Sequence, residues 1–291
     1  MKRTFSHMVS LVFGFWFWFG CLTGLRGEIL LEEYFGYPDG RLVDMSGGIW
    51  KNHSGTESLF VANGGALVGQ SDALGGREDV HHLLASEIDP YTDQSTRLYA
   101  GFTVTFTSLP PVNGTYTAGS YFAHFKAKLA NEFYARVGAN TEGAAPGFFR
   151  LAIANKSWSS ATTSEFPEDL HLGVTYTVVV RLDLATDQST LWVNPTDEGS
   201  PSVTATDILR YGAGPINSFA LRQGADGTPS DNGAPGNSLF DNLVVATSFS
   251  EILVVPEPTV LSLLGTGVAA LLWPRRRPTR SVVFGEDACV P

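Results

Sequence analysis

Residues 98–107 read Leu-Tyr-Ala-Gly-Phe-Thr-Val-Thr-Phe-Thr, and this stretch decides the fold. From Phe102 onward, apolar and hydroxyl side chains alternate. Because successive side chains of a strand point to opposite sides, Phe102, Val104 and Phe106 share one face and the threonines share the other. The alternation predicts a half-buried β-strand, with its phenylalanines facing a core.

A strand pair with the same character follows further along the chain. Residues 176–183 and 190–193 are rich in β-branched residues, and a polar turn joins them, which predicts a β-hairpin. Further strands are predicted at 29–35, 58–61, 119–125, 132–137, 148–154, 218–222 and 239–246. No long segment between 28 and 253 has sustained helical periodicity. The expected fold class is therefore all-β, with two antiparallel sheets packed as a jelly-roll sandwich in one domain.

Short motifs in this region resemble those of concanavalin A-like, laminin-G-like jelly rolls. They are Leu-Leu-Glu-Glu-Tyr-Phe at 30–35, Tyr-Pro-Asp-Gly at 37–40, Leu-Trp-Val-Asn-Pro at 191–195 and Phe-Asp-Asn-Leu-Val-Val at 240–245. The resemblance implies two curved antiparallel sheets over residues 28–253, with the first and last strands paired. It does not imply an activity, because one fold hosts many functions.

The N-terminus has the composition of an export signal. Lys2 and Arg3 precede an apolar run at 8–25, which predicts a signal peptide over residues 1–27 and its removal by signal peptidase. A lipoprotein signal around Cys21 is the weaker interpretation, because bulky Trp18 and Phe19 precede it. The chain is therefore expected to be exported.

A second apolar run lies near the C-terminus, at 259–273. It has 15 residues, fewer than the roughly 20 that span a bilayer as a helix. Val-Pro-Glu-Pro at 255–258 precedes it, and three arginines at 275–277 follow it. Arginines in this position stay on the cytoplasmic side, which would leave the domain outside. An ordinary stop-transfer anchor is one interpretation of this segment.

The other interpretation comes from a resemblance to the PEP-CTERM sorting tail of exported Gram-negative bacterial proteins. Its residues here are Pro256, Glu257, Pro258, the apolar run, Arg275, Arg276 and Arg277. The resemblance implies that 254–278 is a sorting and anchor segment read by an exosortase-type membrane transpeptidase. The protein would be anchored transiently in the inner membrane and then reach the cell surface or extracellular matrix. Residues 279–291 extend further than is usual in that family, and we expect a disordered tail there.

Charge and cysteine content limit the function of the domain. Residues 28–255 contain 12 Lys and Arg against 26 Asp and Glu, a net charge of −14. This balance excludes nucleic acid as a partner, because binding to phosphates needs an excess of Lys and Arg. Cys21 and Cys289 both lie outside the domain, so it has no disulfide.

No carboxylate pattern typical of catalysis is present. Jelly-roll enzymes that cleave β-glucans carry Glu-x-Asp-x-x-Glu on one strand, and this chain lacks that motif. The nearest cluster, Glu165, Glu168 and Asp169, contains a proline and is expected to be a solvated acidic turn. We predict that the protein is not an enzyme. The alternative is a glycoside hydrolase or lyase with an atypical active site on the jelly roll.

Two groups of residues are candidates for binding a metal ion. His81 and His82 are adjacent, so on a strand they would point to opposite faces, and a surface pair is the expected interpretation. Asp226, Asp231 and Asp241 lie among Gly and Asn residues and form a candidate calcium site. The same residue types are also the default formers of turns.

Trp158 is the candidate carbohydrate contact. It lies in the polar stretch 155–160, and sugar rings stack on exposed aromatic side chains. Simple anchoring of a loop is the alternative for Trp158, whereas Trp50 and Trp192 are expected in or beside the core. The sequence therefore predicts a non-catalytic exported protein that binds extracellular polysaccharide or has a structural role.

Overall fold

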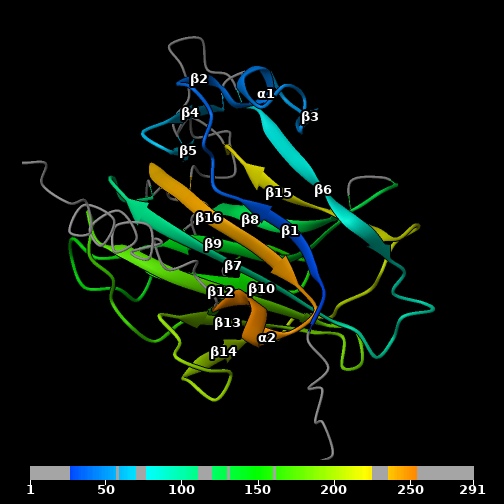
Figure 1. Ribbon diagram of the computed structural model, residues 1–291. Coiled ribbons are helices and arrows are strands. Elements are labelled where there is room, and N and C mark those ends of the chain that lie inside the picture. The colour runs from blue at the N-terminus through cyan, green and yellow to red at the C-terminus, as the bar shows by residue number, and fades with distance from the viewer. Residues whose placement is uncertain are drawn as a thin grey trace, which may run out of the picture. The chain divides into compact units, whose positions relative to one another are not determined.

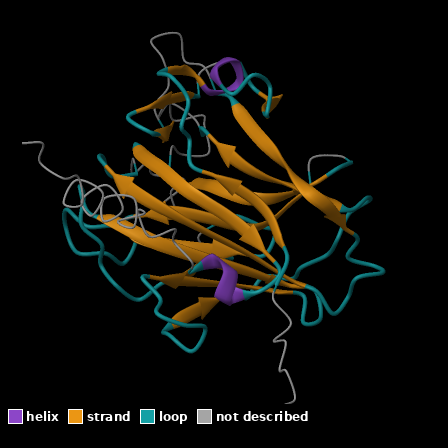
Figure 2. Cartoon of the chain, viewed as in Figure 1, coloured by secondary structure: helices purple, strands orange, loops and turns teal. Residues whose placement is uncertain are grey.

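The computed structural model describes residues 27–56, 59–69, 77–110, 120–129, 132–159, 162–224 and 235–253. Within these ranges the chain is all-β apart from two four-residue helices, α1 (Leu42–Met45) and α2 (Phe249–Ile252). The strands form two antiparallel sheets, arranged as the predicted sandwich (Figure 1; Figure 2). The stretch that opened the sequence analysis is β7 (Arg97–Phe106), with Phe102, Val104 and Phe106 buried as predicted.

The first sheet has nine strands. Its order is β14 (Ser202–Thr204), β13 (Gln188–Val193), β12 (Thr175–Asp183), β7, β16 (Ser238–Ala246), β5 (Gly65–Val68), β4 (Phe60–Ala62) and β2 (Gly40–Arg41), and β1 (Ile29–Glu33) also pairs with β16. The predicted hairpin is confirmed as β12 and β13. The first and last strands are paired, as the resemblance implied.

The second sheet has seven strands. Its order is β11 (Ser164–Glu165), β10 (Arg150–Ala154), β9 (Phe133–Asn140), β8 (Ser120–Ala127), β15 (Ile216–Arg222), β6 (Asp79–Ile88) and β3 (Trp50–Ser54). Neither β6 nor β3 was predicted from the sequence. In β6 the row that faces the core is Val80, His82 and Leu84, so a histidine interrupts the apolar alternation that indicates a strand.

Aromatic rings fill the space between the sheets. Phe102 stacks on Phe240 within the nine-stranded sheet, with ring centroids 4.5 Å apart. It also meets Phe122 and Phe219 of the seven-stranded sheet, each at 6.2 Å. Such rings each bury a large apolar area, and burial of that area is the main favourable term in folding. The domain has no cysteines and therefore no disulfides, so its stability depends on this apolar core.

The outer face of the nine-stranded sheet has its own small apolar cluster. Tyr99, Trp192 and Val244 pack there against Phe249 and Ile252 of α2. The predicted positions of Trp50 and Trp192, in and beside the core, are thus confirmed. The helix covers this face over the middle strands of the sheet (Figure 1).

The predicted signal and sorting segments lie outside the described residues. This holds for residues 1–26 and for 254–291, which include Pro256, Glu257, Pro258 and the three arginines at 275–277. Within the described ranges, no helix is long and apolar enough to cross a membrane.

Candidate functional site

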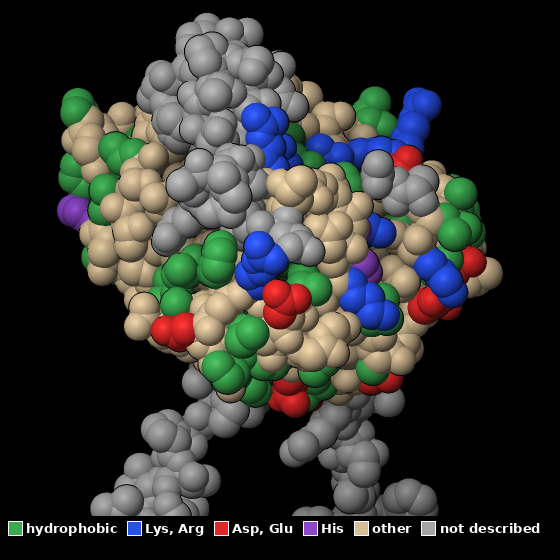
Figure 3. Space-filling view, turned by 90° about the horizontal axis from the view of Figure 1, so that it is seen from above, with side chains coloured by type: hydrophobic (Ala, Val, Ile, Leu, Met, Phe, Trp, Pro, Cys, Tyr) green, Lys and Arg blue, Asp and Glu red, His purple; other side chains and the backbone are tan. Residues whose placement is uncertain are grey.

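A cluster of basic and aromatic side chains lies on the outer face of the seven-stranded sheet, on the side away from the core. We call this cluster the basic face, and it comprises His53, His81, Tyr121, His124, Lys126, Phe133, Arg136 and Arg222. Its members come from β3, β6, β8, β9 and β15. The surface seen from above shows a histidine side chain next to Lys and Arg side chains (Figure 3).

Strand register brings the histidines together. Ala220 of β15 pairs with His124 on one side and with His81 on the other. The ring of His53 lies near both of these histidines. The centroid of that ring lies 5.3 Å from that of His81 and 6.4 Å from that of His124. Phe133 completes the group, 4.5 Å from His124.

Two guanidinium groups contact one tyrosine ring. The Cζ atom of Arg136 lies 4.6 Å from the ring centroid of Tyr121, and the Cζ atom of Arg222 lies 4.7 Å from it. Arg222 also donates a hydrogen bond from Nη1 to Ser120 Oγ. Contact with an aromatic face attracts a cation but does not neutralise its charge. Two positive charges are therefore held close together on this face.

Several buried polar groups here have no hydrogen-bond partner among the described residues. They include both ring nitrogens of His124, Nε of Arg136 and both amide atoms of Asn140. His124 is 1% exposed and Asn140 0%. Asn140 lies four residues after Arg136 on a regular part of β9, so it is on the same side of the sheet. Buried polar groups normally have partners, so this group of orphans is unusual.

Burial keeps the histidines neutral. It lowers the pKa of His53 to about 3 and that of His81 to about 4, and the charge of Lys126 acts in the same direction. The pKa of His124 is also well below its usual value, because the ring is buried and Arg136 is near. At neutral pH each of these rings has one donor and one acceptor nitrogen. The positive charge of the basic face therefore belongs to its two arginines and Lys126.

The carboxylates near Arg136 are committed to other groups. Asp207 accepts backbone N–H groups of Asn155 at 2.6 Å and of Lys156 and Ser157 at 2.8 Å. Glu132 forms an ion pair with Lys156, at 2.5 Å. The charges of Asp207 and Glu132 act to raise the pKa of Arg136, but burial has the larger effect and lowers this pKa. Neither forms an ion pair with this arginine.

Asp79 of β6 lies opposite Arg222 in the pairing of β15 with β6. Its Oδ1 accepts the backbone N–H of Gln223 at 3.2 Å, and burial raises the pKa of Asp79 to about 6 despite the opposing charge of Arg222. In the described part of the chain, Lys126, Arg136 and Arg222 all lack an ion pair with a carboxylate. Within a domain of net charge −14, the basic face is thus a local excess of positive charge.

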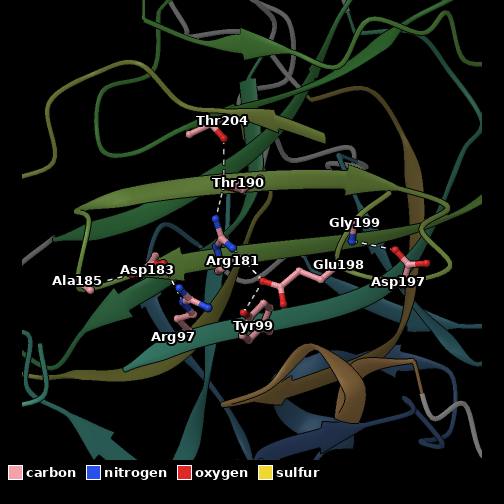
Figure 4. A network of polar contacts seen from close by, with 10 residues as sticks. All are labelled: Arg97, Tyr99, Arg181, Asp183, Ala185, Thr190, Asp197, Glu198, Gly199 and Thr204. Carbon is pink, nitrogen blue, oxygen red and sulfur yellow. Dashed lines mark hydrogen bonds and ion pairs between the residues drawn. The ribbon is translucent and has the colours of Figure 1, made fainter. Parts of the chain in front are cut away.

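The outer face of the nine-stranded sheet shows the opposite arrangement (Figure 4). Arg181 donates to Glu198 Oε1 at 2.9 Å, and the hydroxyl of Tyr99 donates to the same oxygen at 2.8 Å. Arg97 donates to Asp183 at 2.9 Å. These arginines are matched by carboxylates, so the network joins strands and has no excess charge to offer a ligand.

Trp158 lies beside the basic face. Its half-buried indole ring packs over the backbone of Gly138 in β9, with its centroid 5.9 Å from that of Tyr121. The sequence-predicted carbohydrate contact and the basic cluster are therefore neighbours. The sequence does not indicate that they are neighbours, because sheet pairing, and not proximity along the chain, brings them together.

His81 and His82 point to opposite faces, as predicted from their adjacency. They are not a simple surface pair, however. His81 belongs to the basic face, whereas the ring of His82 lies 5.5 Å from that of buried Trp50. His82 is therefore part of the packing at the edge of the core.

The acidic cluster at 165–169 is partly neutralised. Arg150 lies 3.7 Å from Glu165, measured from Nη1 to Oε2, and 2.7 Å from Asp169, measured from Nε to Oδ1. Glu165 is in β11 rather than in a turn, whereas Glu168 and Asp169 follow that strand in a loop, and Glu168 is exposed.

Of the three predicted calcium ligands, only Asp241 lies within the described residues; Asp226 and Asp231 do not. Asp241 is in β16, and its carboxylate accepts the backbone N–H of Asn242 at 2.6 Å and its Nδ2 at 3.1 Å. Among the described residues, no group of three or more His, Cys, Asp or Glu side chains is arranged to hold a metal ion.

The basic face was not predicted from the sequence. Its members are isolated in the sequence, and two of its five strands were not predicted. A usable signal existed in the three strands that were predicted. His124, Arg136 and Arg222 occupy positions in otherwise apolar strands where a solvent-facing Ser or Thr is the ordinary choice.

No family model matches the chain, and no curated protein matches it in sequence. Among solved structures, it is similar to the globular domain of Trypanosoma cruzi calreticulin, with a TM-score of 0.44, 11% identity, and coverage of 84% of this chain and 97% of that one. An alginate lyase from Pseudomonas aeruginosa gives a TM-score of 0.42 and 12% identity, covering 66% and 87%. The carbohydrate recognition domain of Emp47p gives a TM-score of 0.40 and 12% identity, covering 75% and 94%. These are similarities in architecture between proteins of very different sequence.

Proposed function

We propose that this protein is a non-catalytic, exported polysaccharide-binding protein whose binding surface is the basic face together with Trp158. The supporting observation is the set of buried polar groups without partners, next to half-exposed aromatic rings. Sugars present hydroxyl groups, which such polar groups can bind, and apolar ring faces, which stack on aromatic side chains. The same surface combines both kinds of contact.

The side chains divide this work by their chemistry. Trp158 and Tyr121, with ring centroids 5.9 Å apart, supply neighbouring aromatic surfaces for a sugar ring. His53, His81 and Arg136, whose side chains are partly exposed, supply polar groups that have no hydrogen-bond partner among the described residues. A hydroxyl that satisfies them relieves the cost of leaving them unpaired, so binding and hydrogen bonding reinforce each other.

Binding of the purified full-length chain to a panel of neutral and acidic polysaccharides, by affinity electrophoresis and on a glycan array, tests the proposal. We expect at least one class to bind, and Trp158→Ala to weaken that binding by about 10-fold, as the loss of one stacked aromatic side chain implies. Tyr91→Ala is the matched control, because Tyr91 is aromatic, 61% exposed and outside the basic face. Silence across the panel would contradict the proposal.

We also propose that the domain does not cleave its ligand. Two of the three acids in the cluster at 165–169 are engaged by Arg150, which supports a structural role for them. The test is incubation of the wild-type chain with each bound polysaccharide. A steady release of reducing ends or of unsaturated sugars, abolished by Glu165→Gln or Glu168→Gln, would instead favour a hydrolase or lyase.

Export and sorting are a separate proposal that rests on the two ends of the sequence. Signal peptidase would remove the N-terminal segment, and an exosortase-type transpeptidase would act near Pro256, Glu257 and Pro258 before release to the surface or matrix. Changing these three residues to alanine should leave the chain in the inner membrane of a host that has the exosortase. Unchanged release of the altered chain would rule the sorting step out.

A further inference from the structure

We propose that the ligand of the basic face is a uronate-containing polysaccharide, and that Arg136 and Arg222 bind its carboxylate groups beside Tyr121. This inference rests on the proposed function and narrows it to one class of ligand. It depends on the positive charges of the basic face, because a neutral glycan has no negative group to pair with them.

The two guanidinium groups lie close together. Each lies within 4.7 Å of the centroid of the Tyr121 ring, at 4.6 and 4.7 Å, so their Cζ atoms are at most 9.3 Å apart. Like charges at such a separation repel each other unless an anion lies near them. Asp79 accepts the backbone N–H of Gln223, and Asp207 and Glu132 are committed to other groups. An anionic ligand would supply the missing negative charge.

A guanidinium group matches a carboxylate in shape and charge. Both groups are planar, and two parallel N–H groups of an arginine bind the two oxygens of one carboxylate. Arg136 has an Nε–H that is buried and lacks a hydrogen-bond partner within the described ranges, so part of its donor set is unused. A uronate carries one carboxylate on each sugar ring, which suits a face where two arginines lie next to an aromatic ring.

The remaining groups of the basic face fit the rest of a uronate. The rings of His53, His81 and His124 are neutral at neutral pH, because burial lowers their pKa values. His53 and His81 are partly exposed and each offers both a donor and an acceptor, which pair with the hydroxyl groups of a sugar ring. The net charge of −14 also opposes polymers of very high charge density.

The first experiment compares three polymers on the wild-type full-length chain at one ionic strength. They are a polyuronate, the same polymer with its carboxyl groups reduced to alcohols, and a sulfated glycan. We expect the polyuronate to bind, and the reduced polymer to bind at least about 10-fold more weakly, as the loss of a charge-assisted hydrogen bond implies.

The outcomes separate this inference from the proposed function. Equal binding of the polyuronate and its reduced form would overturn the inference and leave polysaccharide binding intact. Binding of none of the polymers would contradict both. A sulfated glycan that binds as tightly as the polyuronate would also overturn the assignment to carboxylates.

The second experiment locates the site with substitutions. Arg136→Gln and Arg222→Gln should each weaken polyuronate binding by about 10-fold or more, and Arg136→Lys should restore it only in part, because lysine keeps the charge but lacks the planar fork. Lys128→Gln is the charge-matched control, since Lys128 is 51% exposed and pairs with half-exposed Glu87. An equal loss in the control would mean that net charge alone governs binding. Thermal melts identify any variant that fails to fold, and the polymer comparison remains decisive in that case.

Discussion

Trp158 packs so closely over Gly138 that a Cβ atom at position 138 would overlap the ring carbons Cη2 and Cζ2 of the indole. The glycine in β9 therefore forms the floor on which the aromatic ring rests. Its role is to provide space, because the backbone of β9 has ordinary strand geometry at this position.

Gly138→Ala should displace Trp158 and weaken polysaccharide binding by about as much as Trp158→Ala does. Overpacking of this kind costs about 1–3 kcal/mol of stability, so the free energy of unfolding should also fall. Gly36→Ala is the control, because Gly36 is exposed and a Cβ atom there would meet nothing within 4 Å. Binding by the Gly138→Ala chain at the wild-type level would show that the position of the indole does not matter.

Glu33→Ala should destabilise the domain by about 2–4 kcal/mol, because it would leave buried donors without an acceptor. The carboxylate of Glu33 is 6% exposed and accepts hydrogen bonds from the backbone N–H of Phe35 at 2.7 Å, Tyr37 Oη at 2.6 Å and Trp50 Nε1 at 2.8 Å. Glu32→Ala, at the exposed neighbouring position, should change the midpoint of urea unfolding very little. Similar midpoints for the two variants would refute this assignment.

Stability should fall as the pH drops from 7.5 to 5.5. The folded-state pKa values of His53 and His81, about 3 and about 4, lie below the value of 6.5 for an exposed histidine. The unfolded chain therefore binds protons below pH 6.5 that the folded chain does not, at about 1.4 kcal/mol per histidine for each pH unit. Asp79 acts oppositely, because its folded-state pKa is raised, but one carboxyl group is outnumbered by three histidines.

Thermal melts across this pH range, with variants, check the assignment. His124→Phe should flatten the loss of stability, because it removes one of the buried neutral rings. His171→Gln is the control, since His171 is exposed and outside the basic face. The charged neighbours of the three histidines are Lys51, Lys126, Arg136 and Arg222. If His124→Phe leaves the pH dependence of stability unchanged, the ring of His124 does not contribute to that dependence.

Polyuronate binding should weaken as salt concentration rises, whereas any binding of a neutral glycan should stay nearly constant. The screening length falls from about 10 Å at 0.1 M salt to about 3 Å at 1 M, so charges on a half-exposed face lose most of their longer-range attraction. Titration calorimetry at several salt concentrations measures this. A polyuronate affinity that is independent of salt would argue against the role of the arginines.

The fold could be predicted largely from the sequence, because its central strands follow the two-residue period. The alternation of Phe102, Val104 and Phe106 with threonines predicts β7, and β12 and β13 are evident from their β-branched residues and intervening turn. Strand β6 could not be predicted in this way. Its inward row contains His82, which packs on Trp50, and a contact between distant strands is not visible in a local pattern.

The candidate site could be predicted only in part. Trp158 is recognisable as an aromatic residue in a polar stretch, but its neighbours are set by sheet order. Arg136 and Arg222 are 86 positions apart in the sequence and meet at Tyr121 only because β9 and β15 both pair with β8. The order of the strands in the sheet decides which of the isolated basic residues come together, and the sequence pattern does not determine that order.

The pairing of β1 with β16 also decides how the domain responds to a mechanical load. Glu28 and Thr247 are joined by two hydrogen bonds, so the two ends of the domain leave it as immediate neighbours. A pulling force applied between these ends would first release α2 and the Glu28–Thr247 hydrogen bonds, and would then peel β1 from β16 one residue pair at a time, from Ile29 and Ala246 onward. Such an opening breaks few hydrogen bonds at a time, so it resists little force. A load applied between one end of the domain and a ligand bound to the other sheet would instead be carried by the contacts between the two sheets.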